Sequence, residues 1–372
     1  MITRLRQMAA LGQAAWIDYI SRELLRSGRL EELIGAGIVG MTSNPTIFQK
    51  AISVGRDYDD DIRDLSRNGA DSYAIYEALA LADICEAADK LRPVYNETHG
   101  RDGYVSIEVN PAHAHHTDAT IHEARRLFQT LHRPNIMIKV PATDAGLPAI
   151  TTLIGEGINV NVTLIFAGAM YERVMQAYLD GLHRLHASRR PLASVSSVAS
   201  FFVSRVDTLV DRLLKERIAA GADGLEHLLG KAAIANAKIA YGRYKAVFAG
   251  EPFALLRDAG ARVQRPLWAS TSTKDPAYTP TKYVDPLIGP NTVNTLPPQT
   301  LDALRLEGNI AQALDTDLEY NHGIMQQLAA AGIDLTAVTD QLLREGVQAF
   351  ADSFEQLLRD IDAKRAALEQ AA

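Results

Sequence analysis

The chain has 372 residues, a length that accommodates either two domains or one barrel with additions. Hydrophobic residues make up 47% and charged residues 22%, the balance of a soluble globular protein, and no uncharged apolar stretch is long enough to predict a membrane span. The net charge of −7 excludes a globally basic surface that attracts nucleic acid or anionic membranes, so an anionic substrate would need a local basic cluster.

The single cysteine, Cys85, excludes an internal disulfide and a thiolate metal site, which favours a cytoplasmic location. Residues 1–13 contain Arg4 and Arg6 but no apolar core of signal-peptide length. We therefore expect a soluble cytoplasmic protein with no membrane partner and no nucleic-acid partner.

Short apolar runs alternate along the chain with polar loops and with segments of helical periodicity. Helices are expected at residues 18–27, 72–88 and 117–132, the last with Thr117 as its N-cap. Eight runs are candidate strands: 13–17, 37–42, 104–109, 136–140, 157–166, 191–196, 263–270 and 291–295. Strands that alternate with helices favour a parallel sheet, and eight of them predict an α/β protein with a (β/α)8 barrel.

Such a barrel needs about 250 residues, which leaves roughly 120 for additions. We expect residues 1–372 to form a single barrel domain with a helical insertion around 207–260 and a C-terminal helical extension around 300–372. Apolar residues recur in the extension every three or four positions: Leu343, Val347, Phe350, Phe354, Leu357 and Ile361. This stripe is expected to pack on the barrel, with a coiled-coil dimer as the alternative, so the protein is a monomer or a homodimer.

Lys139 stands inside the apolar run of the fourth candidate strand, a pattern typical of strands buried on both faces. A buried ammonium must be paired, lose its proton or take part in chemistry, because burial disfavours the charged form. A neutral lysine is an amine nucleophile that forms a Schiff base with a ketone or an aldehyde. The structural alternative is a lysine at the end of a strand that pairs with a carboxylate.

Other polar residues also stand at the ends of predicted strands, where a barrel of this type builds its site. They are Asp18, Asn44, Glu108, Asn161, Thr163, Ser200 and Arg205. Together with the lysine they would supply a nucleophile, proton carriers and groups that hold sugar hydroxyls.

Each of these residues also has a structural interpretation. Asp18 is a candidate helix N-cap, Asn44 a turn residue before a proline, Glu108 an exposed strand residue and Arg205 a surface ion-pair partner. The functional interpretation therefore rests on their joint placement on consecutive strands.

Phosphate recognition is expected after the sixth strand. Ser200 and Arg205 would open the following helix, where backbone N–H groups, the helix dipole and a guanidinium favour an anion. Further positive charge is expected from Lys238, Arg243 or Lys245, and the sequence does not choose among them. No glycine-rich nucleotide-binding motif is present, so no nucleotide cofactor is predicted.

A histidine cluster follows the third strand, with His113, His115, His116 and Asp118 close together and His122 about one helical turn further on. Histidine clusters bind zinc and other transition metals. Since this spacing matches no standard ligand pattern and the cluster precedes a helix, we expect a polar loop without metal. A metal site is the alternative.

Several of these segments resemble the transaldolase family. The matching segments are residues 40–48 (GMTSNPTIF), 105–109 (VSIEV), 138–143 (IKVPAT), 157–166 (GINVNVTLIF) and 198–205 (VASFFVSR). Residues 267–271 (LWAST) are similar to the longer bacterial branch of that family. The matches run in the expected order from about residue 16 to residue 294.

The resemblance implies a class I aldolase-like (β/α)8 TIM barrel that needs no metal or organic cofactor. It also implies transfer of a dihydroxyacetone unit between sugar phosphates in the non-oxidative pentose phosphate pathway. Sedoheptulose 7-phosphate or fructose 6-phosphate would be the donor, and glyceraldehyde 3-phosphate or erythrose 4-phosphate the acceptor.

Roles in the reaction carry over by position. Lys139 resembles the Schiff-base lysine, and Asp18 resembles the residue that takes and returns the proton of the C4 hydroxyl. Glu108 resembles the carboxylate that moves protons during imine formation through a water held near Thr163.

Binding roles carry over in the same way. Asn44 and Asn161 resemble the amides that hold the dihydroxyacetone hydroxyls. Ser200 and Arg205 resemble phosphate ligands, and Phe202 resembles a wall of the pocket. The histidine-rich turn departs from the family pattern, which leaves the fine substrate preference open.

Two other functions remain at this point. One is a Schiff-base aldolase that releases free dihydroxyacetone, which differs in whether turnover depends on an acceptor. The other is a non-catalytic barrel that binds sugar phosphates, and the presence of Lys139, Asp18 and Glu108 argues against it.

Overall fold

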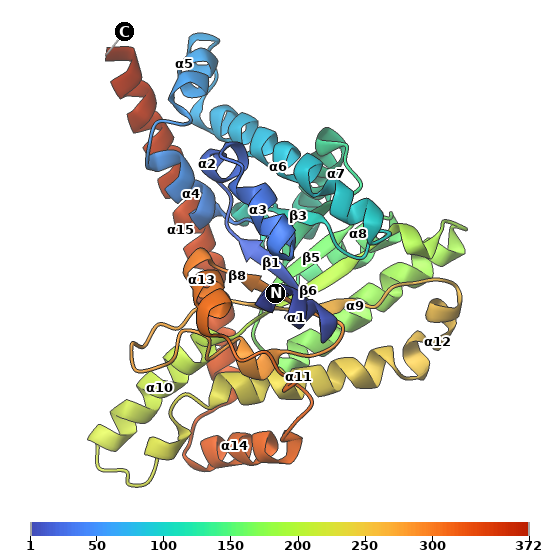
Figure 1. The fold of residues 1–372 in the computed structure, drawn as a ribbon, viewed down its shortest axis with the longest axis vertical. Coiled ribbons are helices and arrows are strands. Elements are labelled where there is room, and N and C mark those ends of the chain that lie inside the picture. Colours follow the sequence, from blue (N-terminus) through green and yellow to red (C-terminus); the bar gives the residue numbers. More distant parts are fainter. Residues whose placement is uncertain (1, 371–372) are drawn as a thin grey trace.

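The computed structural model describes residues 2–370 and contains a closed barrel of parallel strands in the order β1 to β8. Figure 1 shows the strands at the centre of the molecule and helices around them. The strands are β1 (Gln13–Asp18), β2 (Ile38–Thr42), β3 (Tyr104–Glu108), β4 (Ile136–Pro141), β5 (Val160–Ile165), β6 (Ser197–Phe202), β7 (Arg265–Ala269) and β8 (Thr292–Leu296). The predicted (β/α)8 barrel is confirmed.

Helices follow the strands and cover the outside of the barrel, so most strand residues are buried on both faces. In the first half of the chain they are α1 (Arg4–Ala10), α2 (Arg22–Arg26), α3 (Arg29–Ala36), α4 (Pro45–Ser53), α5 (Asp59–Arg67), α6 (Ser72–Glu97), α7 (Thr117–Leu131), α8 (Gly146–Gly155) and α9 (Gly168–Ala187). In the second half they are α10 (Ser204–Ala219), α11 (Ala232–Phe248), α12 (Glu251–Asp258), α13 (Pro298–Glu307), α14 (Leu318–Ala330) and α15 (Leu335–Gln370).

Aromatic side chains fill the barrel near its N-terminal end. Trp16 on β1 is fully buried, and its ring lies 6.4 Å from the ring of Tyr104 on β3. A side chain on residue 40 of β2 would overlap the indole of Trp16, which explains why this position is Gly40. The polar site is therefore left to the other end, where the strands reach their carboxyl termini.

The predicted position of the sixth strand was wrong. The segment Leu192–Ser194 forms a short 3-10 helix, and β6 begins only at Ser197. Ser200 therefore lies inside a strand and does not open the following helix, which begins at Ser204. Thr117 was also misassigned, because His116 holds the N-cap position of α7 and the Thr117 hydroxyl donates instead to the carbonyl of Ala145.

The long helix α15 runs along one side of the molecule against α4 and α5 (Figure 1). Its predicted apolar stripe is buried at Phe350, Phe354, Leu357 and Ile361 and only partly exposed at Leu343 and Val347. The stripe packs on the barrel, as predicted.

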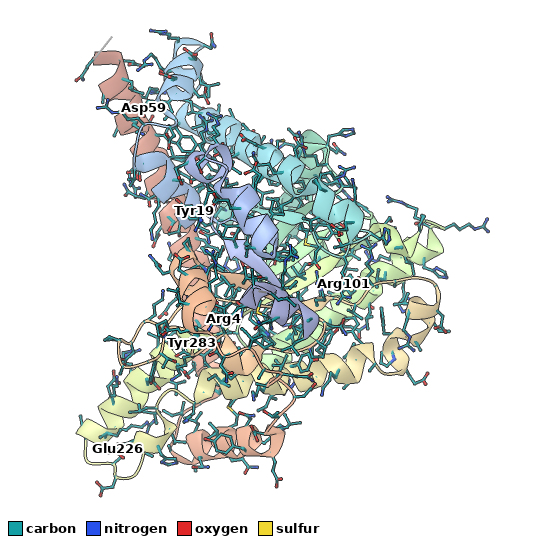
Figure 2. The ribbon with its side chains drawn as sticks, viewed as in Figure 1. Arg4, Tyr19, Asp59, Arg101, Glu226 and Tyr283 are labelled. Atoms are coloured by element: carbon teal, nitrogen blue, oxygen red, sulfur yellow. The ribbon has the colours of Figure 1, made fainter. Side chains whose placement is uncertain are left out.

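Polar contacts reinforce this packing. The hydroxyls of Thr46 and Ser353 lie 2.8 Å apart, and the Lys364 ammonium lies 2.8 Å from Asp59. Figure 2 shows Asp59 where α5 approaches the last turns of α15.

The helices α10, α11 and α12 lie between β6 and β7, where the helical insertion was expected. The division of the chain into a single domain with two additions stays a prediction. No helix in residues 2–370 combines the length and the apolar character needed to cross a membrane.

Candidate active site

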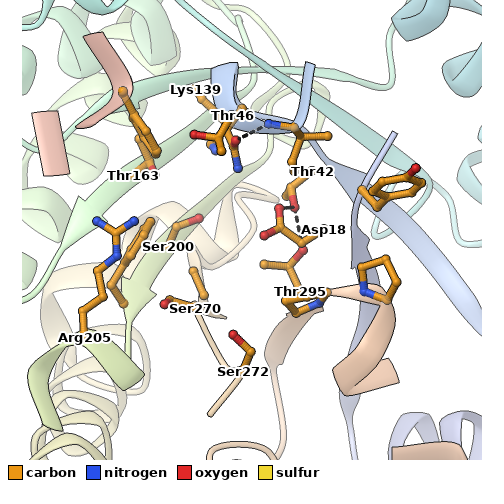
Figure 3. A pocket seen from close by; sticks show the side chains of 18 of the residues that line it. Asp18, Thr42, Thr46, Lys139, Thr163, Ser200, Arg205, Ser270, Ser272 and Thr295 are labelled. Carbon is orange, nitrogen blue, oxygen red and sulfur yellow. Dashed lines mark hydrogen bonds between the residues drawn. The ribbon is translucent and has the colours of Figure 1, made fainter. Parts of the chain in front are cut away.

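A cavity of about 400 Å³ opens at the carboxyl ends of the strands. Figure 3 shows Lys139 and Thr163 at one end of it, with Arg205 and Ser200 on the side opposite Asp18 and Thr42. Most of the predicted site residues line it: Asp18, Asn44, Lys139, Thr163, Ser200, Phe202 and Arg205. The remaining two, Glu108 and Asn161, are buried beside residues of this group.

Lys139 lies on β4 with its side chain 6% exposed. Its ammonium donates a hydrogen bond of 3.0 Å to the carbonyl of Ser43 and lies 3.5 Å from the carboxylate of Glu108. The ring of Phe350 on α15 lies 5.8 Å from the ammonium. The amine therefore reaches the cavity while protein surrounds the rest of the side chain, which is the arrangement that a Schiff-base lysine requires.

Glu108 is paired directly with Lys139 in the register of β3 and β4. Burial raises the pKa of its carboxyl group to about 7, against the opposing effect of the Lys139 charge, and the charge of Asp18 raises it further. A carboxyl group that titrates near neutral pH can both give and accept a proton, which suits a general acid–base catalyst. The alternative of an exposed strand glutamate was wrong.

Asp18 ends β1, and its carboxylate accepts a hydrogen bond of 2.7 Å from the hydroxyl of Thr42. Thr42 is itself fixed by the hydroxyl of Thr295 at 2.6 Å. Burial raises the pKa of Asp18, while the charge of Lys139 and the Thr42 hydrogen bond act in the opposite direction. The N-cap alternative was wrong, because Ser21 caps α2.

The two predicted amides take different positions. Asn44 lines the cavity and also caps α4, since its side-chain oxygen accepts from the backbone N–H of Ile47 at 2.9 Å. The structural and functional interpretations of Asn44 are therefore compatible. Asn161 is fully buried on β5, where its oxygen accepts a hydrogen bond of 2.6 Å from the hydroxyl of Ser200.

Positive charge gathers at the rim of the cavity. Arg205 lies in the first turn of α10 with its guanidinium 5.6 Å from the ring of Phe202, and burial lowers its pKa. Lys274 and Lys50 also line the cavity and were not predicted. The pKa of Lys274 is lowered by burial and then by the charges of Arg205 and Lys50, which indicates three cations close together.

The basic residues that the sequence suggested as additional phosphate ligands lie elsewhere. Lys238 donates to oxygens of residues 313 and 316, Arg243 pairs with Glu172 at 3.1 Å, and Lys245 pairs with Asp315. None of the three lines the cavity, so this prediction was wrong.

The histidine cluster lies outside the cavity. His113 is half-buried in a 3-10 turn, whereas His115 and His116 are exposed. Within residues 2–370 no group of three or more His, Cys, Asp or Glu side chains is arranged to hold a metal ion.

Comparison with known proteins decides the family. The family model described as Transaldolase/Fructose-6-phosphate aldolase matches residues 15–361. The chain belongs to this family. It is 46% identical to Transaldolase 2 of a Nostoc species over 372 residues, covering 98% of both chains. It is 48% identical to the transaldolase of a Parafrankia species over 359 residues and 96% of both chains, and 46% identical to that of Saccharopolyspora erythraea over 371 residues and 99% of both.

Proposed function

We propose that this protein is a transaldolase that moves a dihydroxyacetone unit from a ketose phosphate to an aldose phosphate. The observation that carries the proposal is the buried Lys139 amine, which reaches a polar cavity lined by Asp18 and lies 3.5 Å from the carboxylate of Glu108. Donors would be sedoheptulose 7-phosphate or fructose 6-phosphate, and acceptors glyceraldehyde 3-phosphate or erythrose 4-phosphate. This places the enzyme in the non-oxidative pentose phosphate pathway.

The first half of the reaction is imine formation. The neutral Lys139 amine attacks the ketose carbonyl, and the resulting carbinolamine loses its hydroxyl as water, with Glu108 as the proton donor. The Thr163 hydroxyl is buried without a hydrogen-bond partner among the described residues, and the Glu108 oxygen that faces the Lys139 ammonium at 3.5 Å has no closer polar partner among them. Buried groups of this kind are normally satisfied by ordered water, which supports a proton path through a water near Thr163.

The second half is carbon–carbon bond cleavage. Asp18 takes the proton of the C4 hydroxyl, the C3–C4 bond breaks, and its electron pair moves to the iminium to form an enamine on Lys139. The aldose leaves, an acceptor aldehyde enters, and the same steps run in reverse. Because Thr42 holds the Asp18 carboxylate in place, its second oxygen is free to face the substrate.

The remaining cavity residues suit a sugar phosphate. Asn44, Ser200 and Asn161 offer amide and hydroxyl groups for the dihydroxyacetone end, with Asn161 positioned to act through Ser200. Arg205 and Lys274 supply the positive charge that a phosphate group needs. Phe202 forms an apolar wall between these two ends.

Three further properties belong to the proposal. The reaction as written needs no metal or organic cofactor, because the iminium itself accepts the electron pair. A cytoplasmic location rests on the single Cys85, which has no second cysteine to pair with. A monomer or a homodimer is proposed, since the α15 stripe is already covered within the chain.

Borohydride trapping tests the mechanism. The protein is incubated with fructose 6-phosphate, reduced, and analysed by intact mass and peptide mapping. A dihydroxyacetone adduct on Lys139 that is absent from Lys139→Ala is the expected result. A folded protein that binds the sugar phosphate but forms no adduct would leave only a non-catalytic binding barrel.

The second candidate function is an aldolase that releases free dihydroxyacetone, because the matching family description also names fructose-6-phosphate aldolase. Both enzymes form the same enamine, and they differ in whether water protonates it before an acceptor arrives. Phe350 covers one side of Lys139, which supports restricted water access and hence transfer. Turnover of fructose 6-phosphate that requires erythrose 4-phosphate identifies the transferase.

A further inference from the structure

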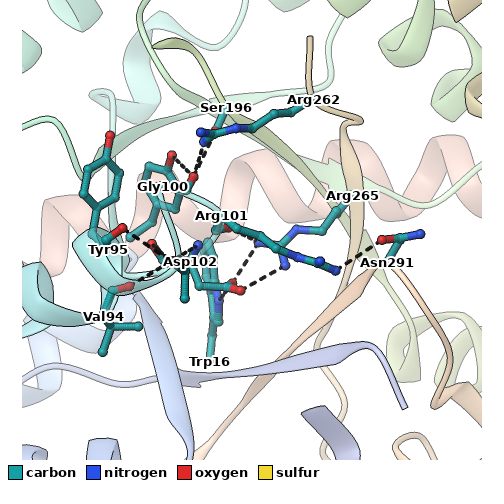
Figure 4. Close-up of polar contacts among 12 residues, drawn as sticks. Trp16, Val94, Tyr95, Gly100, Arg101, Asp102, Ser196, Arg262, Arg265 and Asn291 are labelled. Atoms are coloured by element: carbon teal, nitrogen blue, oxygen red, sulfur yellow. Dashed lines mark hydrogen bonds and ion pairs between the residues drawn. The ribbon is translucent and has the colours of Figure 1, made fainter. Parts of the chain in front are cut away.

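The N-terminal end of the barrel contains a second cavity of about 250 Å³, which shares no lining residue with the active-site cavity. Three arginines line it, Arg101, Arg262 and Arg265, together with polar side chains of Ser196, Ser197 and Asn291. No carboxylate appears among the described residues that line it. Figure 4 shows the three arginines and their contacts, with Arg262 beside Gly100 and Ser196, Arg265 beside Asp102 and Arg101 beside Asn291.

Arg265 begins β7 and is the buried member of the group, with its side chain 8% exposed. It forms an ion pair of 2.8 Å with Asp102, which also accepts a hydrogen bond of 3.2 Å from the indole of Trp16. Among the ion pairs of the described residues, Asp102 is the one carboxylate that contacts any of these three arginines. The charge of the cluster is therefore neutralised only in part.

Arg262 is held by neutral oxygens. Its guanidinium donates to the backbone carbonyls of His99 and Gly100 and, at 2.9 Å, to the hydroxyl of Ser196. The loop adopts the left-handed conformation at both His99 and Gly100, which aims successive carbonyls at this arginine. These contacts fix the orientation of Arg262 and leave its full positive charge uncompensated by an ion pair.

Arg101 completes the group from the exposed side. Its guanidinium donates a hydrogen bond of 3.2 Å to the side-chain oxygen of Asn291, and its carbonyl accepts one of 2.6 Å from Arg265. Arg101 and Arg262, which have no carboxylate partner among the described ion pairs, thus line a preformed cavity together with the buried Arg265. Such fixed guanidinium groups match the geometry and charge of a tetrahedral oxyanion.

We propose that this N-terminal cavity binds a phosphate oxyanion, held by Arg101, Arg262 and Arg265. The volume accommodates inorganic phosphate or the phosphoryl end of a small monoester, whereas drug-sized ligands occupy about 300–1,000 Å³. The hydroxyl of Ser196 and the amide of Asn291 add polar contacts at the rim. Occupancy would stabilise the folded protein by an amount that grows with the logarithm of the anion concentration once this exceeds Kd, without touching the lysine site.

The test measures phosphate binding by calorimetry in a background that lacks the three rim cations of the active site, Arg205→Ala with Lys274→Ala and Lys50→Ala. Inorganic phosphate and glycerol 3-phosphate are titrated separately at constant ionic strength, with chloride as the balancing anion. One binding event is expected to remain in this background. The tighter of the two probes identifies whether the site takes the free ion or a monoester.

Arg101→Gln in the same background is expected to weaken that event about ten-fold, the effect of losing one charged hydrogen bond. Arg257→Gln, at an exposed position of α12, serves as the matched control and should leave binding unchanged. Arg101 is exposed, so the variant should fold; an unchanged melting temperature without phosphate checks this. A background that binds neither probe, or equal binding by Arg101→Gln and the control, overturns the proposal and makes the cluster structural only.

Discussion

The ammonium of Lys139 lies 3.5 Å from the carboxylate of Glu108, on the adjacent residue of the neighbouring strand. Both side chains are almost fully buried, so neither is independent of the other. The pair can hold one proton in two ways, as an ammonium with a carboxylate or as an amine with a carboxylic acid. The second form contains both the nucleophile and the proton donor that imine formation requires.

The pair makes stability depend on pH. Burial raises the pKa of Glu108 from 4.5 to about 7 on folding, so folding is favoured while the group is protonated. This contribution, about 3 kcal/mol, is present below pH 4.5 and is lost as the pH rises to about 7. Glu108→Gln removes this titration. The unfolding free energy of Glu108→Gln minus that of the unsubstituted protein should therefore be larger at pH 8 than at pH 5. Urea denaturation at both values measures this, and a constant difference would show that Glu108 stays ionised.

Asp18→Asn should separate imine formation from bond cleavage. The substitution removes the base for the C4 hydroxyl, so kcat should fall about 10²- to 10⁴-fold. Lys139 is untouched, and borohydride should still trap the donor ketose on it. Because burial raises the pKa of Asp18, the acidic limb of the pH–kcat profile should lie above pH 3.8. Asp144→Asn, at an exposed position, is the control, and loss of trapping in Asp18→Asn would assign Asp18 to imine formation instead.

Arg205→Ala tests phosphate recognition. Loss of a charged hydrogen bond to the substrate phosphate should raise KM for fructose 6-phosphate about 10- to 100-fold. Activity with unphosphorylated fructose should change less than two-fold, since that substrate presents no phosphate. Arg212→Ala, on the same helix and exposed, should leave both unchanged. An equal loss with both sugars would mean that Arg205 shapes the cavity rather than binding phosphate.

Phe350→Ala should convert part of the transfer into hydrolysis. Its ring covers Lys139, so truncation opens a path for water to the enamine. Release of free dihydroxyacetone in the absence of an acceptor should rise, together with a stability loss of about 3 kcal/mol from the cavity created.

Phe354→Ala is the matched control for Phe350→Ala. It lies one turn further along α15 and packs on the ring of Tyr76 at 5.1 Å, so it should cost similar stability. A rise in free dihydroxyacetone in both variants would attribute the leak to general loosening of α15 rather than to the cover over Lys139.

The barrel and much of the site could be predicted because local patterns carry them. Apolar runs with one or two polar interruptions located β3, β4 and β5, and the interruptions include Glu108, Lys139 and Asn161. The sixth strand was misplaced because β6 carries two serines and one alanine among its six residues and lacks a comparable apolar run. The resemblance still placed Ser200 in the site.

The cations of the rim could not be predicted in the same way. Lys274 lies in the loop after β7 and Lys50 in α4, and only closure of the barrel brings them near Arg205. Lys238, Arg243 and Lys245 are equally basic in sequence, yet on α11 their side chains contact other partners outside the cavity. Which basic residues from distant parts of the sequence come together depends on tertiary packing, and composition does not encode this packing.

The packing of α15 also has a consequence for synthesis. Phe350, which covers the nucleophile, follows all eight strands in the chain, and Ser353 and Lys364 bond to residues made some 300 positions earlier. A nascent chain on the ribosome can close its barrel while these residues are still within the exit tunnel. During that interval Lys139 lacks the contact with the Phe350 ring. Because translation runs from the N-terminus, Lys139 is synthesised and can fold into the barrel before Phe350, which covers it, is available.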